Sequence, residues 1–131
     1  TMTREVKFRG KRVDNGEWLY GNYIKRWCGT KHKHYINDRL YDYEVDPETV
    51  GEYTNFCDKN SKEIYEGDIV RHEEGLNHIV FKDGAYKAEY ILSFDWQTND
   101  SYTVDELQNC CEIIGNIYEN PELLAANTSS E

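Results

Sequence analysis

One stretch of the sequence, YKAEYILSFDW at residues 86–96, alternates apolar and polar side chains more regularly than any other. Every second residue from Lys87 onward is polar, with the single exception of Ile91. The apolar set consists of Tyr86, Ala88, Tyr90, Leu92, Phe94 and Trp96. Successive side chains of a β-strand point to opposite faces, so this period of two predicts a long strand with one buried face. Such a strand is long enough to bend around a small barrel.

Several shorter stretches alternate in the same way and are separated by residues typical of tight turns. Residues 6–11 and 17–24 predict an N-terminal hairpin, because Asp14-Asn15-Gly16 between them tolerates the positive φ of short hairpin turns. A second hairpin is expected around a turn at Asn37-Asp38. Asn120-Pro121 predicts a short C-terminal helix, since a capping Asn precedes Pro at the first helical position. Further strands are expected at residues 52–56, 62–65, 68–72, 77–82 and 112–118.

The composition also favours strands. The chain has 42 residues of the types Val, Ile, Thr, Tyr, Phe and Trp, but only 12 of Ala, Leu and Met. This balance excludes a coiled coil, a helical bundle and a membrane span. A length of 131 residues predicts a single domain, 1–131. We expect a mainly β fold in which an N-terminal hairpin region, 4–44, packs on a small β-barrel or roll that continues into the C-terminal helix, 45–125.

Charge is distributed unevenly along the chain. The formal net charge is −10, yet residues 1–40 hold ten basic and four acidic residues, whereas residues 41–131 hold five basic and twenty-one acidic ones. A strongly acidic protein is a poor non-specific ligand for nucleic acid. We therefore expect the basic hairpin to lie against the acidic remainder. The alternative is that the basic segment forms a binding patch of its own.

The four cysteines do not suggest a metal site or a disulfide. The sequence shows no export signal, so we expect free thiols in a reducing cytosol. Cys28, His32 and His34 lie close together in the sequence, but the spacing C-x3-H-x-H matches no common zinc framework. We therefore expect surface histidines and predict no metal and no cofactor.

Four blocks of sequence resemble a known family. They are residues 4–11 with 16–21 (REVKFRGK, GEWLYG), 45–54 (VDPETVGEYT), 58–60 with 62–70 (DKN, KEIYEGDIV) and 113–124 (IIGNIYENPELL). In this order they resemble the YopX family, small proteins of bacteriophages and of bacterial genomes that carry prophages. The resemblance implies a mostly β structure with a barrel similar to SH3 domains, and a location in the host bacterial cytoplasm. It implies no established catalytic activity.

Two positions depart from the family pattern, which usually has glycine where this chain has Asn55 and Ser61. Asn is the next-best residue for a left-handed backbone, whereas Ser61 indicates a changed turn type. Other motif residues are interpreted as structural: Gly67 as a source of backbone freedom and Asp68 as a turn hydrogen-bond acceptor. The full structural set is Pro47, Gly51, Tyr53, Tyr65, Gly67, Asp68, Gly115 and Pro121.

No catalytic motif is present. The sequence lacks a nucleophile elbow, an H-E-x-x-H pair, a phosphate-binding Gly loop and a dinucleotide fingerprint. We therefore predict a non-catalytic accessory protein that binds a host or phage protein, or itself, through edge strands or aromatic surface, with no membrane contact. One alternative is an acidic decoy of a nucleic-acid-binding protein. The other is a nucleic-acid-binding surface made of Lys7, Arg9, Lys11, Lys25, Arg26, Trp27, Lys31 and Lys33.

Overall fold

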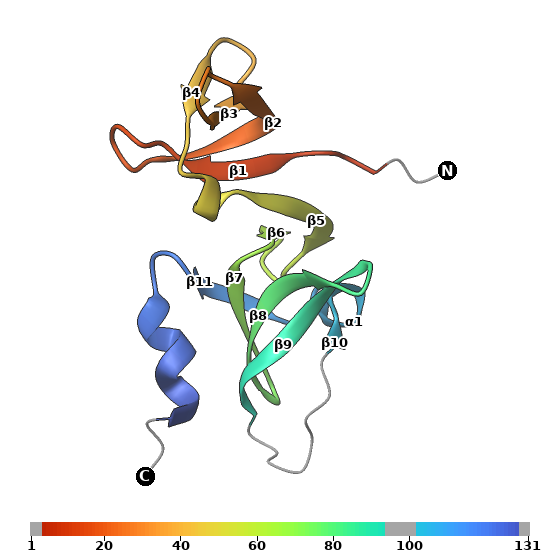
Figure 1. Cartoon of the computed structure of the whole chain (residues 1–131). Helices are drawn as coiled ribbons and strands as arrows, with labels where there is room; N and C mark the ends of the chain where they lie inside the picture. The colour runs from red at the N-terminus through yellow and green to blue at the C-terminus, as the bar shows by residue number, and fades with distance from the viewer. Residues whose placement is uncertain (1–3, 94–101, 129–131) are drawn as a thin grey trace. The chain divides into compact units, whose positions relative to one another are not determined.

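The computed structural model describes residues 4–93 and 102–128 of the chain (Figure 1). The chain forms two compact units, Thr1–Tyr53 and Thr54–Glu131. The boundary lies inside one strand, so the polypeptide passes from the first unit to the second without a linker. The last residues of the alternating stretch, Phe94 to Trp96, lie outside the described residues.

The first antiparallel sheet has the strand order β4-β3-β2-β1-β5-β6, and all of it except the end of β5 and β6 (Glu63–Tyr65) belongs to the N-terminal unit. Both predicted hairpins are present: the first turns at Gly16, which has φ 74°, and the second at residues 38–41. The elements are β1 (Phe8–Lys11), β2 (Trp18–Trp27), β3 (His32–Asn37), β4 (Asp42–Glu44), the 3-10 helix η1 (Pro47–Thr49) and the start of β5 (Gly51–Cys57).

Strand β2 is long because its first part pairs with one neighbouring strand and its second part with another. Its first part, Trp18 to Gly21, pairs with β1, whereas its second part, Asn22 to Trp27, pairs with β3. The change of partner therefore occurs between Gly21 and Asn22. A pocket of the N-terminal unit lies at this change of partner.

The C-terminal unit is built around an antiparallel sheet with strand order β10-β9-β8-β7-β11. Among its described residues, seven side chains form the buried core: Ile64, Val70, Ile79, Ala88, Val104, Leu107 and Cys111. Its elements are the end of β5, then β6 (Glu63–Tyr65), β7 (Asp68–His72), β8 (Gly75–Lys82), β9 (Ala85–Ser93), β10 (Tyr102–Thr103), α1 (Val104–Leu107), β11 (Glu112–Asn116) and the 3-10 helix η2 (Pro121–Thr128).

The predicted mainly β fold is confirmed, and the structure refines three of its details. The edge strands β10 and β11 do not pair in the part of the chain that the structure describes, so this sheet is open rather than a closed barrel. The helical turn α1 separates these two strands in the chain. The predicted C-terminal helix starts at Pro121, as expected, but is of the 3-10 type. The packing of the hairpin on a barrel, the SH3-like detail and the single-domain organisation stay predictions.

Ile91, the exception in the alternating stretch, has a structural cause. Leu76 pairs with Leu92, but the next residue, Asn77, pairs with Tyr90. Ile91 is therefore an extra residue in β9, which makes it the centre of a β-bulge. A bulge shifts the alternation by one position, and this shift explains why Ile91 is buried although its neighbours in the pattern predict exposure.

The carboxylate of Asp58 joins the turn after β5 to strand β11. Asp58 is completely buried, and its Oδ1 accepts hydrogen bonds from the backbone N–H groups of Asn60 (2.8 Å) and Lys62 (2.9 Å). Its Oδ2 accepts from Ile113 N at 3.0 Å. Burial alone would raise the pKa of Asp58, but these backbone hydrogen bonds hold it below the ordinary value of an aspartate. Asp58 is therefore charged at neutral pH and fixes the turn against β11.

Replacing Asp58 by Asn tests this link. The new carboxamide would keep one acceptor oxygen but place an NH2 donor against a backbone N–H, so D58N is expected to lower the free energy of unfolding by about 1–3 kcal/mol at neutral pH. Because the folded pKa lies below the unfolded one, the stabilisation is full above about pH 4 and is lost as the pH falls through the folded value. The difference between wild type and D58N in urea unfolding should therefore shrink at low pH.

The control for this experiment is D83N, at an exposed turn position where Asn tolerates the observed φ of 56°. It should change the free energy of unfolding by less than about 0.5 kcal/mol. A gap between wild type and D58N that stayed constant down to about pH 2 would contradict the proposed role of the Asp58 charge.

Candidate binding surface of the N-terminal unit

The sheet of the N-terminal unit distributes the eight predicted nucleic-acid-binding residues over two faces. Residues that pair across strands point to the same face, and faces alternate along a strand. The registers of β1, β2 and β3 therefore place Lys7, Arg9, Lys11, Arg26 and Lys33 on one face. Lys25 and Trp27 lie on the opposite face, and Lys31 belongs to the turn between β2 and β3. The eight residues do not form one continuous patch.

Most cations of the first face already have partners. Arg9 is only 5% exposed, and its guanidinium lies 4.8 Å from the ring centre of Trp18. Lys7 Nζ lies 5.2 Å from the ring centre of Tyr53 and 3.6 Å from a carboxylate oxygen of Glu5. These cation–π contacts and ion pairs occupy the groups that a phosphate backbone would need.

Arg26, on the same face, is engaged in the same two ways. Its guanidinium pairs with Asp42 at 3.1 Å and lies 5.0 Å from the ring centre of Tyr35. Both partners come from the strands next to β2 or beyond it, so Arg26 helps to hold the sheet together.

The tip of the β2–β3 hairpin, residues 25–34, differs from the rest of the face. It contains four basic and no acidic residues. Lys25, Lys31 and Lys33 form no ion pair with another described residue, and Trp27 is 60% exposed beside the ring of His32. We call this segment the basic tip.

The residues considered for a zinc site do not converge. The Tyr23 hydroxyl shares a hydrogen bond with Nδ1 of His34, and Cys28 Sγ contacts the Arg26 carbonyl oxygen at 3.7 Å. Among residues 4–93 and 102–128, no group of three or more His, Cys, Asp or Glu side chains is arranged to hold a metal ion. None of the described helices is long and apolar enough to cross a membrane.

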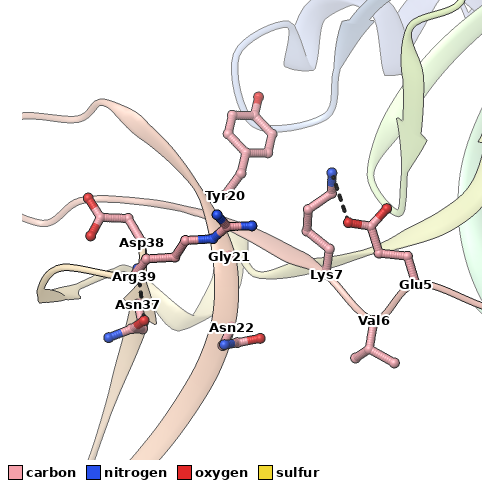
Figure 2. Close-up of a pocket in the computed structure, with 9 residues that line it drawn as sticks. All are labelled: Glu5, Val6, Lys7, Tyr20, Gly21, Asn22, Asn37, Asp38 and Arg39. Carbon is pink, nitrogen blue, oxygen red and sulfur yellow. Dashed lines mark hydrogen bonds and ion pairs between the residues drawn. The ribbon is translucent and has the colours of Figure 1, made fainter.

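A pocket of about 370 Å³ lies where β2 changes partner (Figure 2). Three short segments line it: Glu5 to Lys7 before β1, Tyr20 to Asn22 in β2, and Asn37 to Arg39, which run from the last residue of β3 into the following turn. A volume of this size lies within the range of small-ligand sites. Sequence reasoning singled out only Lys7 among these residues as a binding group.

Gly21 lines this pocket and lies very close to the backbone of Asn37. A Cβ atom at this position would lie 2.0 Å from the Asn37 carbonyl oxygen, which is far inside any permitted contact. Only glycine lets the backbones of β2 and of the residues after β3 approach so closely. The main chain therefore sets the shape of the pocket here, and the glycine requirement accounts for Gly21 within the GEWLYG block.

The turn after β3 is held by two short polar side chains. Asn37 Oδ1 accepts a hydrogen bond from Arg39 N at 2.9 Å, and Asp38 Oδ1 accepts from the backbone N–H groups of Leu40 and Tyr41, each at 3.0 Å. These backbone hydrogen bonds lower the pKa of Asp38 below its ordinary value. The turn keeps Arg39 at φ 89°, a backbone conformation that residues other than glycine rarely adopt.

Apolar side chains surround the same turn and pocket. Leu40 is 78% exposed and Tyr41 is 64% exposed, at the tip of the β3–β4 hairpin. Val6 and Tyr20, which line the pocket, are also exposed. The sequence gives one indication of Leu40 and Tyr41, because Asn37-Asp38 just before them predicts a turn. Exposure of the residues that follow a turn is, however, a property of the folded structure.

The family-motif residues of the C-terminal unit make structural contacts. Gly67 has φ 96°, and a Cβ there would lie 2.9 Å from the ring of Tyr118. Asp68 accepts a hydrogen bond from Tyr65 N at 2.8 Å, and Tyr65 donates its hydroxyl hydrogen to Glu63. A Cβ at Gly115 would meet the Asn120 side chain at 2.4 Å, next to the start of η2 at Pro121. These contacts support the structural interpretation.

The motif residues of the N-terminal unit lie in η1 and at the start of β5. Pro47 begins η1, whose N-cap Asp46 accepts a hydrogen bond from Glu48 N. Gly51 is buried and pairs with Arg9, and Tyr53 is nearly buried beneath Lys7. Asn55 and Ser61 both adopt positive φ, 70° and 65°, so Ser61 has the left-handed backbone that glycine usually provides.

Cys110 and Cys111 are neighbours in the sequence but have different surroundings, since Cys110 is exposed and Cys111 is buried. Burial raises the pKa of the Cys111 thiol to about 11, so it is protonated at neutral pH. The Sγ atom of Cys110 contacts the Leu107 carbonyl oxygen at 3.2 Å.

Comparison with known proteins places the chain in a family. A family model described as YopX protein matches residues 7–125. The chain belongs to the YopX family. No curated protein matches it. Among solved structures, the crystal structure of protein EF1440 from Enterococcus faecalis is similar, with a TM-score of 0.52 and 22% identity over 93% of this chain and 99% of that chain. At this identity the likeness shows the fold alone.

The close approach at Gly21 predicts a large effect of a single methyl group. Gly21→Ala should lower the free energy of unfolding by about 3 kcal/mol, the upper end of the range for added volume in a packed site. Gly10→Ala is the matched control, because its Cβ would meet only the Val45 side chain, at 3.1 Å. Urea unfolding measures both. Equal losses in the two variants would show that the Asn37 carbonyl can move aside.

Proposed function

We propose that this YopX protein is a non-catalytic protein-interaction module, an accessory protein of a phage or prophage, whose N-terminal unit docks on a partner protein. The supporting observation is the distribution of exposed large apolar side chains among the described residues. In the C-terminal unit they are Phe81 and Leu124. In the N-terminal unit they are Val6, Val13, Tyr20, Trp27, Leu40 and Tyr41.

The tip of the β3–β4 hairpin is the strongest part of this surface. Leu40 and Tyr41 are adjacent and mostly exposed, and the backbone N–H groups of both are fixed by Asp38. Aromatic and large aliphatic side chains on a rigid turn lose little conformational entropy on binding. Tyr and neighbouring apolar groups also dominate the energetics of many protein interfaces.

The charges support a protein partner over a nucleic acid. On the sheet face that carries Lys7, Arg9 and Arg26, the cations are largely paired with carboxylates or stacked on aromatic rings. The protein also carries a net charge of −10. Long-range repulsion by the acidic C-terminal unit opposes the approach of a polyanion.

Quantitative affinity capture from lysate of the bacterial host tests the proposal. The double variant L40S/Y41S should lose at least about tenfold of any specifically captured protein, which corresponds to removing one interface hot spot. F81S, which removes a 55%-exposed side chain from the other unit, is the matched control and should retain the partner. A captured protein that is retained equally by L40S/Y41S and wild type would contradict docking by this turn.

Other outcomes of the same capture point elsewhere. Recovery of a nuclease or polymerase through the C-terminal unit would favour the acidic decoy. Recovery of a second copy of the chain, seen also as a larger species in sizing chromatography, would favour self-association through an edge strand.

The basic tip supports a second candidate, weak binding of single-stranded nucleic acid. Its three lysines without ion pairs to other described residues, and the exposed Trp27, are the groups that contact phosphates and stack on bases. A labelled oligonucleotide of about 12 nucleotides should then bind at about 50 mM salt and be released at about 200 mM.

Fluorescence anisotropy with charge variants tests this second candidate. K31Q/K33Q should weaken oligonucleotide binding, whereas K59Q/K62Q, an equal change of charge in the C-terminal unit, should not. No anisotropy change for wild type at low salt, or equal weakening by both variants, would rule out the basic tip as a nucleic-acid site.

A further inference from the structure

Arg39 has a backbone conformation that needs an explanation. Its φ of 89° is unfavourable for a residue with a long side chain and would suit glycine. The surrounding turn enforces it, because Asn37 accepts the Arg39 N–H and Asp38 accepts the next two. Strained backbone that its surroundings hold in place is often found at ligand sites.

The strained turn directs the Arg39 side chain across the pocket. In Figure 2 the side chain extends from the turn towards Gly21 and Tyr20, while the Asp38 carboxylate points away from it. The guanidinium makes no ion pair, cation–π contact or side-chain hydrogen bond with another described residue. The pocket therefore contains a cation on a backbone held by hydrogen bonds, and its five N–H donors are open to a ligand.

A second polar group of the pocket is also uncommitted. The Asn22 carboxamide is exposed on the same side of β2 as Tyr20 and has no hydrogen-bond partner among the described residues. Asn37, across the strand pair from Asn22, is occupied by its bonds to Asp42 and Arg39. Asn22 and Arg39 thus provide donors from two different segments, next to the exposed side chains of Tyr20 and Val6.

The remaining charges of the pocket select among anions. Glu5 and Lys7 pair with each other at 3.6 Å, so the described lining has one further carboxylate, Asp38, besides the Arg39 cation. A doubly charged phosphate would be repelled by both carboxylates of the lining. A singly charged carboxylate matches the planar, bidentate geometry of a guanidinium at lower repulsion.

We infer that this pocket binds the carboxylate of a single Asp or Glu side chain of the partner protein, with Arg39 as the main donor, Asn22 as a second donor and Tyr20 and Val6 as flanking apolar contacts. The inference rests on the proposed function in one respect, that the ligand belongs to a protein. The pocket would then recognise the charge of the partner, and the neighbouring Leu40 and Tyr41 its apolar surface.

NMR titration of the ¹⁵N-labelled full chain tests the inference without the partner. The probes are the capped tripeptide acetyl-Gly-Glu-Gly-amide, its Gln counterpart and inorganic phosphate, each added at constant ionic strength. The Glu peptide should shift the Arg39 Nε–H and Asn22 side-chain NH2 signals saturably, with a Kd of about millimolar order for one isolated anchor. The Gln peptide should cause no saturable shift, and phosphate should bind more weakly.

Variants of Arg39 separate a binding role from a structural one. Arg39→Gly should raise the thermal midpoint, because glycine relieves the positive φ, and should also weaken the Glu peptide at least about tenfold. Arg39→Lys keeps the charge without the bidentate fork and should weaken binding severalfold. Lys59→Gln, which removes an exposed cation of the C-terminal unit, is the control and should bind as wild type does.

Three results would overturn the inference. They are equal shifts with the Glu and Gln peptides, tighter binding of phosphate than of the Glu peptide, and unchanged peptide binding or a lower thermal midpoint in Arg39→Gly. Because the peptides replace the partner, a failed lysate capture leaves this result intact. Conversely, a failed titration leaves the apolar docking by Leu40 and Tyr41 to be judged by capture alone.

Discussion

The buried carboxylate of Asp58 is the interaction on which the C-terminal unit depends. Three backbone N–H groups from two segments far apart in the sequence end on its two oxygens. Lys59 N also bonds to the Cys111 carbonyl oxygen, so the same turn is held twice to the chain that leads into β11. This arrangement fixes one edge strand of the sheet through a polar group that lies beside the apolar core residue Cys111.

The N-terminal unit depends on a constraint of the opposite kind, the absence of a side chain at Gly21. There the Asn37 carbonyl oxygen occupies the space of a Cβ, and β2 can leave β1 and join β3 within one residue. Both units are thus organised by contacts to main-chain atoms. Hydrophobic side chains then cover the sheets, but the geometry of the turns and of the pocket is set by backbone and by short polar groups.

The sequence predicted the elements well because their signals are local. Alternation and turn residues identified the two N-terminal hairpins and the strands, and the four motif blocks identified the family. The bulge at Ile91 was visible as a break in the pattern, although only the register shows that the residue is extra. The open order of the C-terminal sheet could not be predicted, because strand order depends on pairings between distant segments.

The candidate site was harder to predict for the same reason. The seven cations and one tryptophan of the predicted surface were divided between two faces of the sheet and a turn, and the partners of Arg9 and Arg26 could be found only in three dimensions. Arg39 carried no signal in the sequence beyond its position after a predicted turn. Its interest lies in a φ value and in a guanidinium left open towards the pocket, neither of which composition or spacing encodes.

The close approach at Gly21 also has a consequence for the evolution of the family. Because a carbonyl oxygen and a glycine shape the hollow, substitutions at Tyr20, Asn22 or Arg39 can change its lining without removing it. Relatives that keep the glycine can therefore inherit the same cavity and alter its chemistry one side chain at a time. A binding protein whose partner changes can in this way acquire a new specificity while its scaffold stays the same.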